Sequence, residues 1–257
     1  MSSPRCAILS WNVRGLNLPA RRSAVREVVD GHQPLVLCIQ ETKLDAWSPD
    51  LVRQIGGSRL DGCMVLPVIG TRGGAAIHWD SGAIHMSTHA VGRFAITAKA
   101  SVLHDNACFW LTIVYGPADD ACKDDFLHEL AGTAPPLGQP WLVNGDFNII
   151  YEARDKNNLN LNRRIMGRFR SAIDAAGLRE IKCKNRRYTW SNERRSPTLV
   201  GIDKFFCNTE WELLFPSHTL MAASTACSDH CPLLLANTQA PRRQARFRFE
   251  SFWPRFP

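Results

Sequence analysis

The sequence lacks three features that mark secreted or membrane proteins. Its nine cysteines are odd in number and contain no CxxC pair, so they do not form a disulfide framework. The first five residues, MSSPR, carry no apolar segment like that of a signal peptide. No apolar run approaches the ~18 residues of a membrane-spanning helix. We therefore expect a reduced, soluble, intracellular protein with no membrane partner.

Metal-binding cysteine motifs are also scarce. Cys227, His230 and Cys231 are close enough together for a zinc site, but the chain offers no second pair of such ligands elsewhere. Small buried thiols are the favoured interpretation. The chain also has no internal repeat and no low-complexity block.

What the chain does have is enough apolar material for a large core. It has 257 residues and 45% apolar content, which favours a single α/β domain, predicted here over residues 1–238. Residues 239–257 are predicted to be a basic, aromatic tail, suited either to nucleic-acid binding or to a linker. The net charge of +7 favours a polyanionic partner, although most basic side chains merely solvate a surface.

Short apolar runs predict a protein rich in strands. Strands at 6–11 and 35–39 flank a helix that opens at Pro19, and both strands are nearly all apolar, which indicates a sheet covered on its faces. Antiparallel strands follow, then further helices and strands. The antiparallel strands are expected at 64–67, 74–79, 83–86, 93–98 and 107–114, the helices at 120–132 and 163–176, and the later strands at 141–143, 188–190, 199–207 and 231–236.

Polar residues stand where several of these strands end. The central example is Asp146 and Asn148, which follow an apolar run and lie two residues apart on one strand face. A carboxylate can take a proton from water or hold a cation, and an amide can donate and accept hydrogen bonds at the same centre. An isolated Gly-Asp-x-Asn is also a good turn, so the residues at the other strand ends decide between a turn and a catalytic site.

Five further strand ends carry such residues. They are Asn12, Glu41, Tyr115, Asp203 and His230. Asp203 lies in an otherwise apolar strand, where a carboxylate needs a partner, and His230 is the natural candidate. Each residue alone could be a cap, a solvated charge or a satisfied core histidine, but together they predict one polar site at a sheet edge.

At these residues the sequence resembles the endonuclease/exonuclease/phosphatase superfamily. The motifs are SWN at 10–12, QET at 40–42, VYGP at 114–117, NGDFN at 144–148, GID at 201–203 and SDH at 228–230. Within the superfamily the chain looks most like the endonuclease domain of plant LINE-type (non-LTR) retrotransposons. The additional reasons are SWNVRGLN at 10–17, DKNNLNLNRR at 155–164 and RFRFESFW at 246–253.

The resemblance implies a DNase I-like, four-layer α/β sandwich of two packed mixed β-sheets flanked by helices. It also implies a Mg²⁺-dependent endonuclease, with Mn²⁺ as a substitute, that nicks DNA and leaves a 3′-hydroxyl for primed reverse transcription. The expected partners are DNA and a reverse transcriptase domain encoded downstream, and the expected location is the nucleus.

The resemblance further implies roles for individual residues. Glu41 and Asn12 would hold the metal, with Asp229 supporting that side. Asp146, oriented by Asn148, would position and deprotonate the attacking water, while His230, held by Asp203, would stabilise the phosphorane and Tyr115 would brace the phosphate. The DNA-binding residues are expected to be Arg14, Trp190, Arg194 and Arg195, the last two at the tip of a hairpin formed by residues 191–198.

Two positions depart from the family pattern. Gly201 replaces a residue that is usually basic, which removes a possible phosphate contact and weakens a strand interior. Arg14 stands where abasic-site repair enzymes carry an acidic residue. The alternatives are therefore an abasic-site endonuclease or small phosphate-ester phosphatase of the same fold, and a catalytically decayed nucleic-acid-binding remnant.

Overall fold

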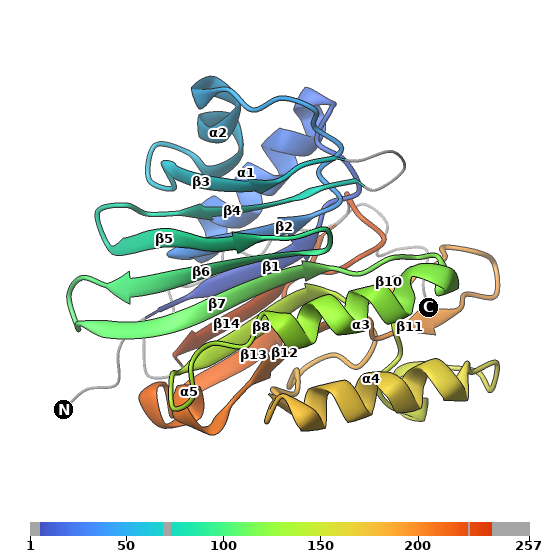
Figure 1. Ribbon diagram of the computed structural model, residues 1–257. Helices are drawn as coiled ribbons and strands as arrows, with labels where there is room; N and C mark the ends of the chain where they lie inside the picture. Colours follow the sequence, from blue (N-terminus) through green and yellow to red (C-terminus); the bar gives the residue numbers. More distant parts are fainter. Residues whose placement is uncertain (1–5, 69–72, 226, 238–257) are drawn as a thin grey trace.

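Two six-stranded sheets form the centre of the protein in a computed structural model, which describes residues 6–68, 73–225 and 227–237 (Figure 1). The first sheet has the order β13-β14-β1-β2-β4-β3 and the second the order β5-β6-β7-β8-β12-β9. The first contains β1 (Ile8–Asn12), β2 (Val36–Gln40), β3 (Gly62–Leu66), β4 (Ala75–Trp79), β13 (His218–Ala222) and β14 (Leu233–Asn237). The second contains β5 (Ile84–Val91), β6 (Ala95–Val102), β7 (Ala107–Tyr115), β8 (Trp141–Asp146), β9 (Arg179–Glu180) and β12 (Asp203–Cys207).

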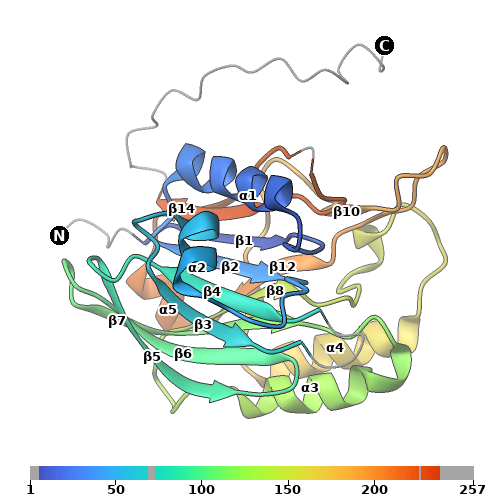
Figure 2. The same ribbon diagram turned by 90° about the horizontal axis from the view of Figure 1, so that it is seen from above.

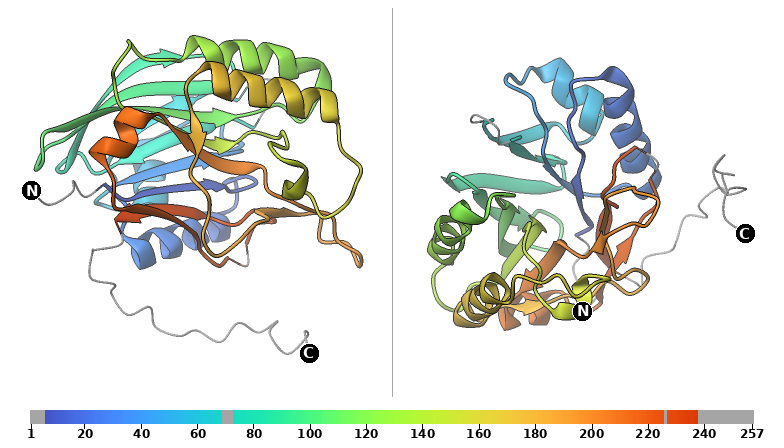
Figure 3. Two further views of the ribbon diagram at one scale, coloured as in Figure 1. Left: turned by 90° about the horizontal axis from the view of Figure 1, so that it is seen from below. Right: turned by 90° about the vertical axis from the view of Figure 1, so that its right-hand side faces the viewer.

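Helices cover the outer face of each sheet. α1 (Pro19–His32) and α2 (Pro49–Gly56) lie together on the first sheet (Figure 2), and α3 (Lys123–Gly132) and α4 (Arg163–Ala175) lie side by side on the second (Figure 3). A short α5 (Thr209–Leu214), two 3₁₀ turns (Asp120–Cys122 and Ala153–Asp155) and the hairpin strands β10 (Trp190–Ser191) and β11 (Leu199–Val200) complete the elements. The predicted four-layer α/β sandwich is confirmed.

Alternating side chains of the strands explain these layers. In β1 the side chain of Ile8 belongs to the apolar cluster between the sheets, while that of Leu9 belongs to the cluster beneath α1 and α2. In β12 Phe205 and Phe206 divide in the same way, Phe206 facing α4. Both faces of each sheet are therefore buried, as nearly continuous apolar strands require.

Helix α4 shows how the local sequence fixes an element. Asn162 precedes it and accepts a hydrogen bond from the backbone N–H of Ile165 at 3.2 Å, which satisfies one free donor of the first turn. Ile165, Phe169 and Ile173 recur every four residues and are all buried. This stripe belongs to the core, as its spacing predicts.

The strand register brings the ends of three strands together. Tyr115 pairs with Asp146 across the parallel β7 and β8, and Asp146 pairs with Asp203 across the antiparallel β8 and β12. Gly145 permits this approach: its φ is +136°, and a Cβ there would lie 2.1 Å from the Val114 carbonyl oxygen. The glycine before Asp146 is therefore required by packing against β7.

The structure corrects the prediction of one strand over residues 199–207. β11 ends at Val200 and β12 begins at Asp203, so Gly201 lies between strands rather than inside one. A Cβ on Gly201 would lie 2.7 Å from the carbonyl oxygen of Arg187, which explains the glycine by close backbone approach.

Smaller differences remain, among them strands β9 and β13, which are not predicted from the sequence. Helices α2 and α5 are not predicted from the sequence, and α1 continues through Gly31 to His32 before Gln33 adopts a left-handed conformation. The tail predicted at 239–257, and with it the domain boundary at 238, lies outside the described residues. Within the described part of the chain, no helix has the length and apolar character needed to cross a bilayer.

Candidate active site

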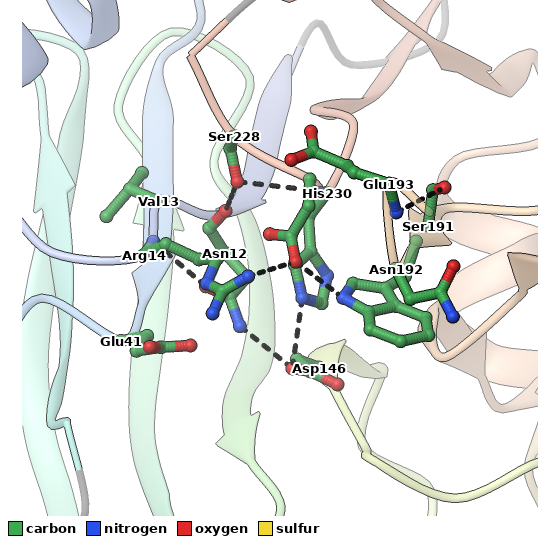
Figure 4. A network of polar contacts seen from close by, with 12 residues as sticks. Asn12, Val13, Arg14, Glu41, Asp146, Ser191, Asn192, Glu193, Ser228 and His230 are labelled. Atoms are coloured by element: carbon green, nitrogen blue, oxygen red, sulfur yellow. Dashed lines mark hydrogen bonds and ion pairs between the residues drawn. The ribbon is translucent and has the colours of Figure 1, made fainter. Parts of the chain in front are cut away.

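The predicted polar residues meet where the two sheets end at the same edge (Figure 4). Asn12 closes β1 and pairs with Gln40, so Glu41 follows directly on the neighbouring strand. The side chain of Asn12 donates a 2.9 Å hydrogen bond from Nδ2 to Oδ2 of Asp146, which joins the first sheet to the second. One bond between buried groups thus ties the two halves of the site.

Asp146 is the most enclosed carboxylate of the site, with 1% of its surface exposed. Its Oδ1 accepts a 2.9 Å bond from the backbone N–H of Asn148, and Oδ2 accepts a 3.3 Å bond from Nδ2 of the same residue. Burial raises the pKa of Asp146 and nearby Asp203 raises it further, while His230 and these hydrogen bonds oppose the rise. A carboxylate with a raised pKa is suited to accept a proton from water.

His230 is fixed by Asp203. Its Nδ1 lies 2.9 Å from Oδ2 of Asp203, and its Nε2 lies 4.0 Å from Oδ2 of Asp146. Burial opposes the charged imidazole, but the carboxylates of Asp203, Asp146 and Asp229, with Asp203 the largest contributor of the three, together outweigh burial and raise the pKa of His230 to about 9. The histidine is therefore cationic near neutral pH, with Nε2 turned toward Asp146 and available as a donor.

Glu41 and Tyr115 form the other side of the site. Glu41 follows β2 with a left-handed φ of +55°, and its carboxylate lies 2.8 Å from Nζ of Lys43. Burial, then the carboxylates of Glu41 and Asp146, raise the pKa of Tyr115, so its hydroxyl stays neutral and shares a hydrogen bond with Glu41. Arg14 and Asn148 also have positive φ, and such conformations in non-glycine residues gather at functional sites.

Asp229 connects Arg14 to Trp190. Its Oδ2 accepts hydrogen bonds from Nη1 of Arg14 and, at 2.7 Å, from Nε1 of Trp190. Its other oxygen, Oδ1, is buried and has no hydrogen-bond partner among the described residues. One oxygen of Asp229 is thus committed to the protein, while the other is buried without a partner among the described residues.

Glu41, Asn12 and Asp229, the three residues predicted to hold a metal, offer oxygen atoms of the kind that a hard divalent cation prefers. Glu41 supplies a partly exposed carboxylate, Asp229 supplies the unpartnered Oδ1, and Asn12 supplies an amide oxygen that also accepts the backbone N–H of Arg14. A separate group of Asp146, Asp203 and His230 also has ligand atoms within 4.8 Å of one another, and all three are buried. Because His230 already uses Nδ1 to bind Asp203, we interpret that group as an acid–base set.

Of the predicted DNA-binding residues, Arg14 and Trp190 contact Asp229 inside the site, whereas Arg194 and Arg195 lie in a neighbouring hairpin loop. Trp190 lies beside His230, with ring centroids 6.5 Å apart. Arg194 and Arg195 are exposed in the loop of the β10–β11 hairpin, which extends away from the sheets (Figure 2). Trp190 pairs with Val200 of β11, so the hairpin is confirmed, although β11 and the strand carrying Asp203 are separate.

Two residues of the site had no predicted role. Ser228 accepts a bond from the backbone N–H of His230 and donates one to the carbonyl oxygen of Asn12, so it links the His230 loop to β1. Lys43 neutralises Glu41. Ser228 lies inside the motif SDH and Lys43 directly follows the motif QET. These positions are the sequence signal that could have pointed to a role in the site.

Comparison with known proteins gives a family match and several structural matches. Residues 9–230 match the Endonuclease/Exonuclease/phosphatase family. No curated protein sequence matches the chain.

Among solved structures, an AP endonuclease from Leishmania major aligns with a TM-score of 0.74 at 17% identity, covering 91% of this chain and 87% of that one. The endonuclease domain of TRAS1, a telomere-specific non-LTR retrotransposon, gives 0.68 at 12% identity, with 91% and 99% covered. D. rerio TDP2 complexed with single strand DNA product gives 0.61 at 14%, with 90% and 98% covered. At these identities the likeness shows the fold alone.

Proposed function

Because the chain belongs to the endonuclease/exonuclease/phosphatase family, we propose that it is a Mg²⁺-dependent DNA endonuclease of a non-LTR retrotransposon of the plant LINE type. It nicks one strand and leaves a 3′-hydroxyl, from which a reverse transcriptase encoded downstream primes synthesis. The family consists of hydrolases that act on phosphate esters, and the retrotransposon assignment rests on the motifs at 10–17 and 155–164.

The observation that carries the proposal is the arrangement of Asp146 opposite His230. The Asp146 carboxylate is buried and is oriented by hydrogen bonds from Asn12 and Asn148. Nε2 of His230 lies 4.0 Å from Oδ2 of Asp146, and Asp203 helps to keep the imidazole protonated. Phosphodiester hydrolysis needs an oriented water, a group that accepts its proton, and a positive charge beside the negatively charged phosphorane. Asp146 supplies the base and His230 the charge.

The remaining residues complete the reaction. Glu41, Asn12 and Asp229 would hold the divalent cation, which neutralises charge on a non-bridging phosphate oxygen when bound. The neutral hydroxyl of Tyr115 donates to the phosphate, and the guanidinium of Arg14, half exposed beside Asp229, contacts the backbone of the DNA.

The two alternative functions have less support. The structure gives Gly201 a packing reason, because a side chain there would press on the Arg187 carbonyl, so the glycine is weak support for a decayed remnant. Arg14 places a guanidinium on Asp229, whereas repair enzymes are expected to carry an acid at that position. The net charge of +7 favours DNA over a small phosphate ester.

Nicking of supercoiled plasmid tests the proposal. The protein should convert supercoiled DNA to the open circle with Mg²⁺, and not with EDTA. Equal cleavage of undamaged and abasic duplexes would support the endonuclease assignment, while cleavage of abasic duplexes alone would favour repair. Binding without cleavage in any divalent metal would favour the decayed remnant.

A further inference from the structure

A short basic segment lies just before the strand that carries Trp190. Residues 182–187 read KCKNRR, and the side chains of Lys182, Lys184, Arg186 and Arg187 are all exposed. We call these four residues the basic strip. None of them forms an ion pair with a described residue, whereas other exposed arginines do, such as Arg53 with Asp50 and Arg168 with Asp124.

Hydrogen bonds to β13 hold the backbone of the strip in place. Asn185 donates to the carbonyl oxygen of Ala222 at 2.8 Å and accepts from its backbone N–H at 2.7 Å. The backbone N–H of Lys184 donates to the carbonyl oxygen of Leu220 at 3.0 Å. Because the backbone is held by β13, the four charges are presented at little further cost in backbone entropy.

Two cavities flank the strip and share part of it. One, of about 400 Å³, is lined by all four basic residues together with Asp203. The other, of about 640 Å³, is lined by Arg186 and Arg187 and reaches Trp190 and His230. A hollow surface therefore runs from the candidate catalytic histidine past Arg186 and Arg187.

The acidic residues of the first cavity pair with cations outside the strip. Lys204 pairs with Asp155 at 3.0 Å and Glu180 at 2.7 Å, Arg154 pairs with Glu152, and Asp203 pairs with His230. The four carboxylates of the lining thus pair with three cations outside the strip, Lys204, Arg154 and His230, so one negative charge in excess stands against the four positive charges of the strip. In the second cavity Asp229 is paired with Arg14. The remaining acidic residue of that lining is Glu193 of the hairpin, and the lining also contains Arg186 and Arg187.

Positive charges that are fixed, exposed and unpaired beside a phosphodiester-cleaving site suit the phosphates of the same polymer. We propose that the basic strip binds backbone phosphates of the DNA strand that leaves the active site past Trp190. The strip is distinct from the hairpin arginines: the strip precedes Trp190 in the chain, whereas Arg194 and Arg195 follow it. This assignment rests on the proposed function, because it takes the substrate to be DNA.

The salt dependence of duplex binding, measured with EDTA so that no cleavage occurs, tests the strip. Each lost phosphate contact should reduce the slope of log K against log salt by about 0.9, so Arg186→Gln with Arg187→Gln should reduce it by about 2. The matched control is Lys99→Gln with Arg170→Gln, which removes the same charge from β6 and α4 and should leave the slope unchanged. Arg186→Lys with Arg187→Lys keeps the charge and should keep the slope.

Plasmid nicking with Mg²⁺ separates the strip from the chemistry. The glutamine variant should raise KM several-fold with kcat within about twofold of wild type, because the strip touches no reacting atom. A slope equal to that of the Lys99/Arg170 control would overturn the assignment, even if wild type nicks normally. If wild type does not nick but the glutamine variant still loses slope, the strip stands and the hydrolytic function fails.

Discussion

The support that Asp203 gives to His230 should be visible as a change in pH dependence. Asp203→Asn keeps the shape of the side chain and can still accept a hydrogen bond from Nδ1, but it removes the negative charge that keeps the imidazole protonated. In wild type this charge is the largest of the three carboxylate contributions that together raise the pKa of His230 to about 9, against an ordinary value of about 6.5, a total difference of about 3 kcal/mol in favour of the charged form.

The size of the effect follows from the two protonation states. With the pKa of His230 returned to about 6.5, the variant keeps only about 3% of His230 charged at pH ~8, where wild type keeps about 90%, so the rate should fall about 30-fold. At pH ~6 both proteins are mostly protonated, and the ratio of rates should approach unity apart from altered orientation.

The assay is single-turnover nicking of a labelled duplex between pH ~5.5 and ~9, with saturating protein. Asp174→Asn, which removes an exposed carboxylate from α4, is the control for a charge change and should follow wild type. If the ratio of wild type to Asp203→Asn is the same at both ends of the range, Asp203 does not act through the protonation of His230, and the reasoning is wrong.

Three other perturbations test separate parts of the account. Glu41→Ala should raise the Mg²⁺ concentration needed for half-maximal nicking at least tenfold, and undiminished activity at low Mg²⁺ would remove Glu41 from the metal site. Replacing residues 193–197 with a short Gly-Ser turn should redistribute nick positions on a mapped duplex while total nicking survives, and an unaltered map would place site choice elsewhere. Burial lowers the pKa of His78 to about 4, and neither ring nitrogen has a partner among described residues. The unfolded state therefore binds the proton more tightly, and the stability should fall by up to about 3 kcal/mol as pH drops from 6.5 to 4. His78→Leu should flatten this loss in urea titrations, and an equally steep loss in that variant would contradict it.

Much of the site could be predicted because its residues lie within, at or beside the end of a short apolar run. Asp146 and Asn148 end a strand whose length and composition are local properties, and Tyr115 ends another in the same way. Parallel pairing of β7 with β8 then necessarily brings these ends to one edge. The pairing of Asp203 with His230 followed from a charge in an apolar strand, which required a partner.

Other features depend on contacts that no local pattern reveals. Arg14 and Asp229 meet although they are 215 residues apart, and nothing near either residue indicates this pairing. The break after Val200 arises because Gly201 passes close to the Arg187 carbonyl, so the apolar pattern of 199–207 could not show it. Helices α2 and α5 have only 8 and 6 residues, too short for a helical repeat to stand out.

The most direct test of the central claim compares Asp146→Ala, His230→Ala and the double variant. Single-turnover nicking is followed by extension of the nick with a DNA polymerase, which requires a 3′-hydroxyl. Wild type should give extendable nicks, and each single variant should lose nearly all nicking while duplex binding is retained, because distributed basic groups hold the backbone. The double variant should be little slower than either single, since the two groups act as a unit. Extendable nicking at the wild-type rate in either single variant would contradict the account.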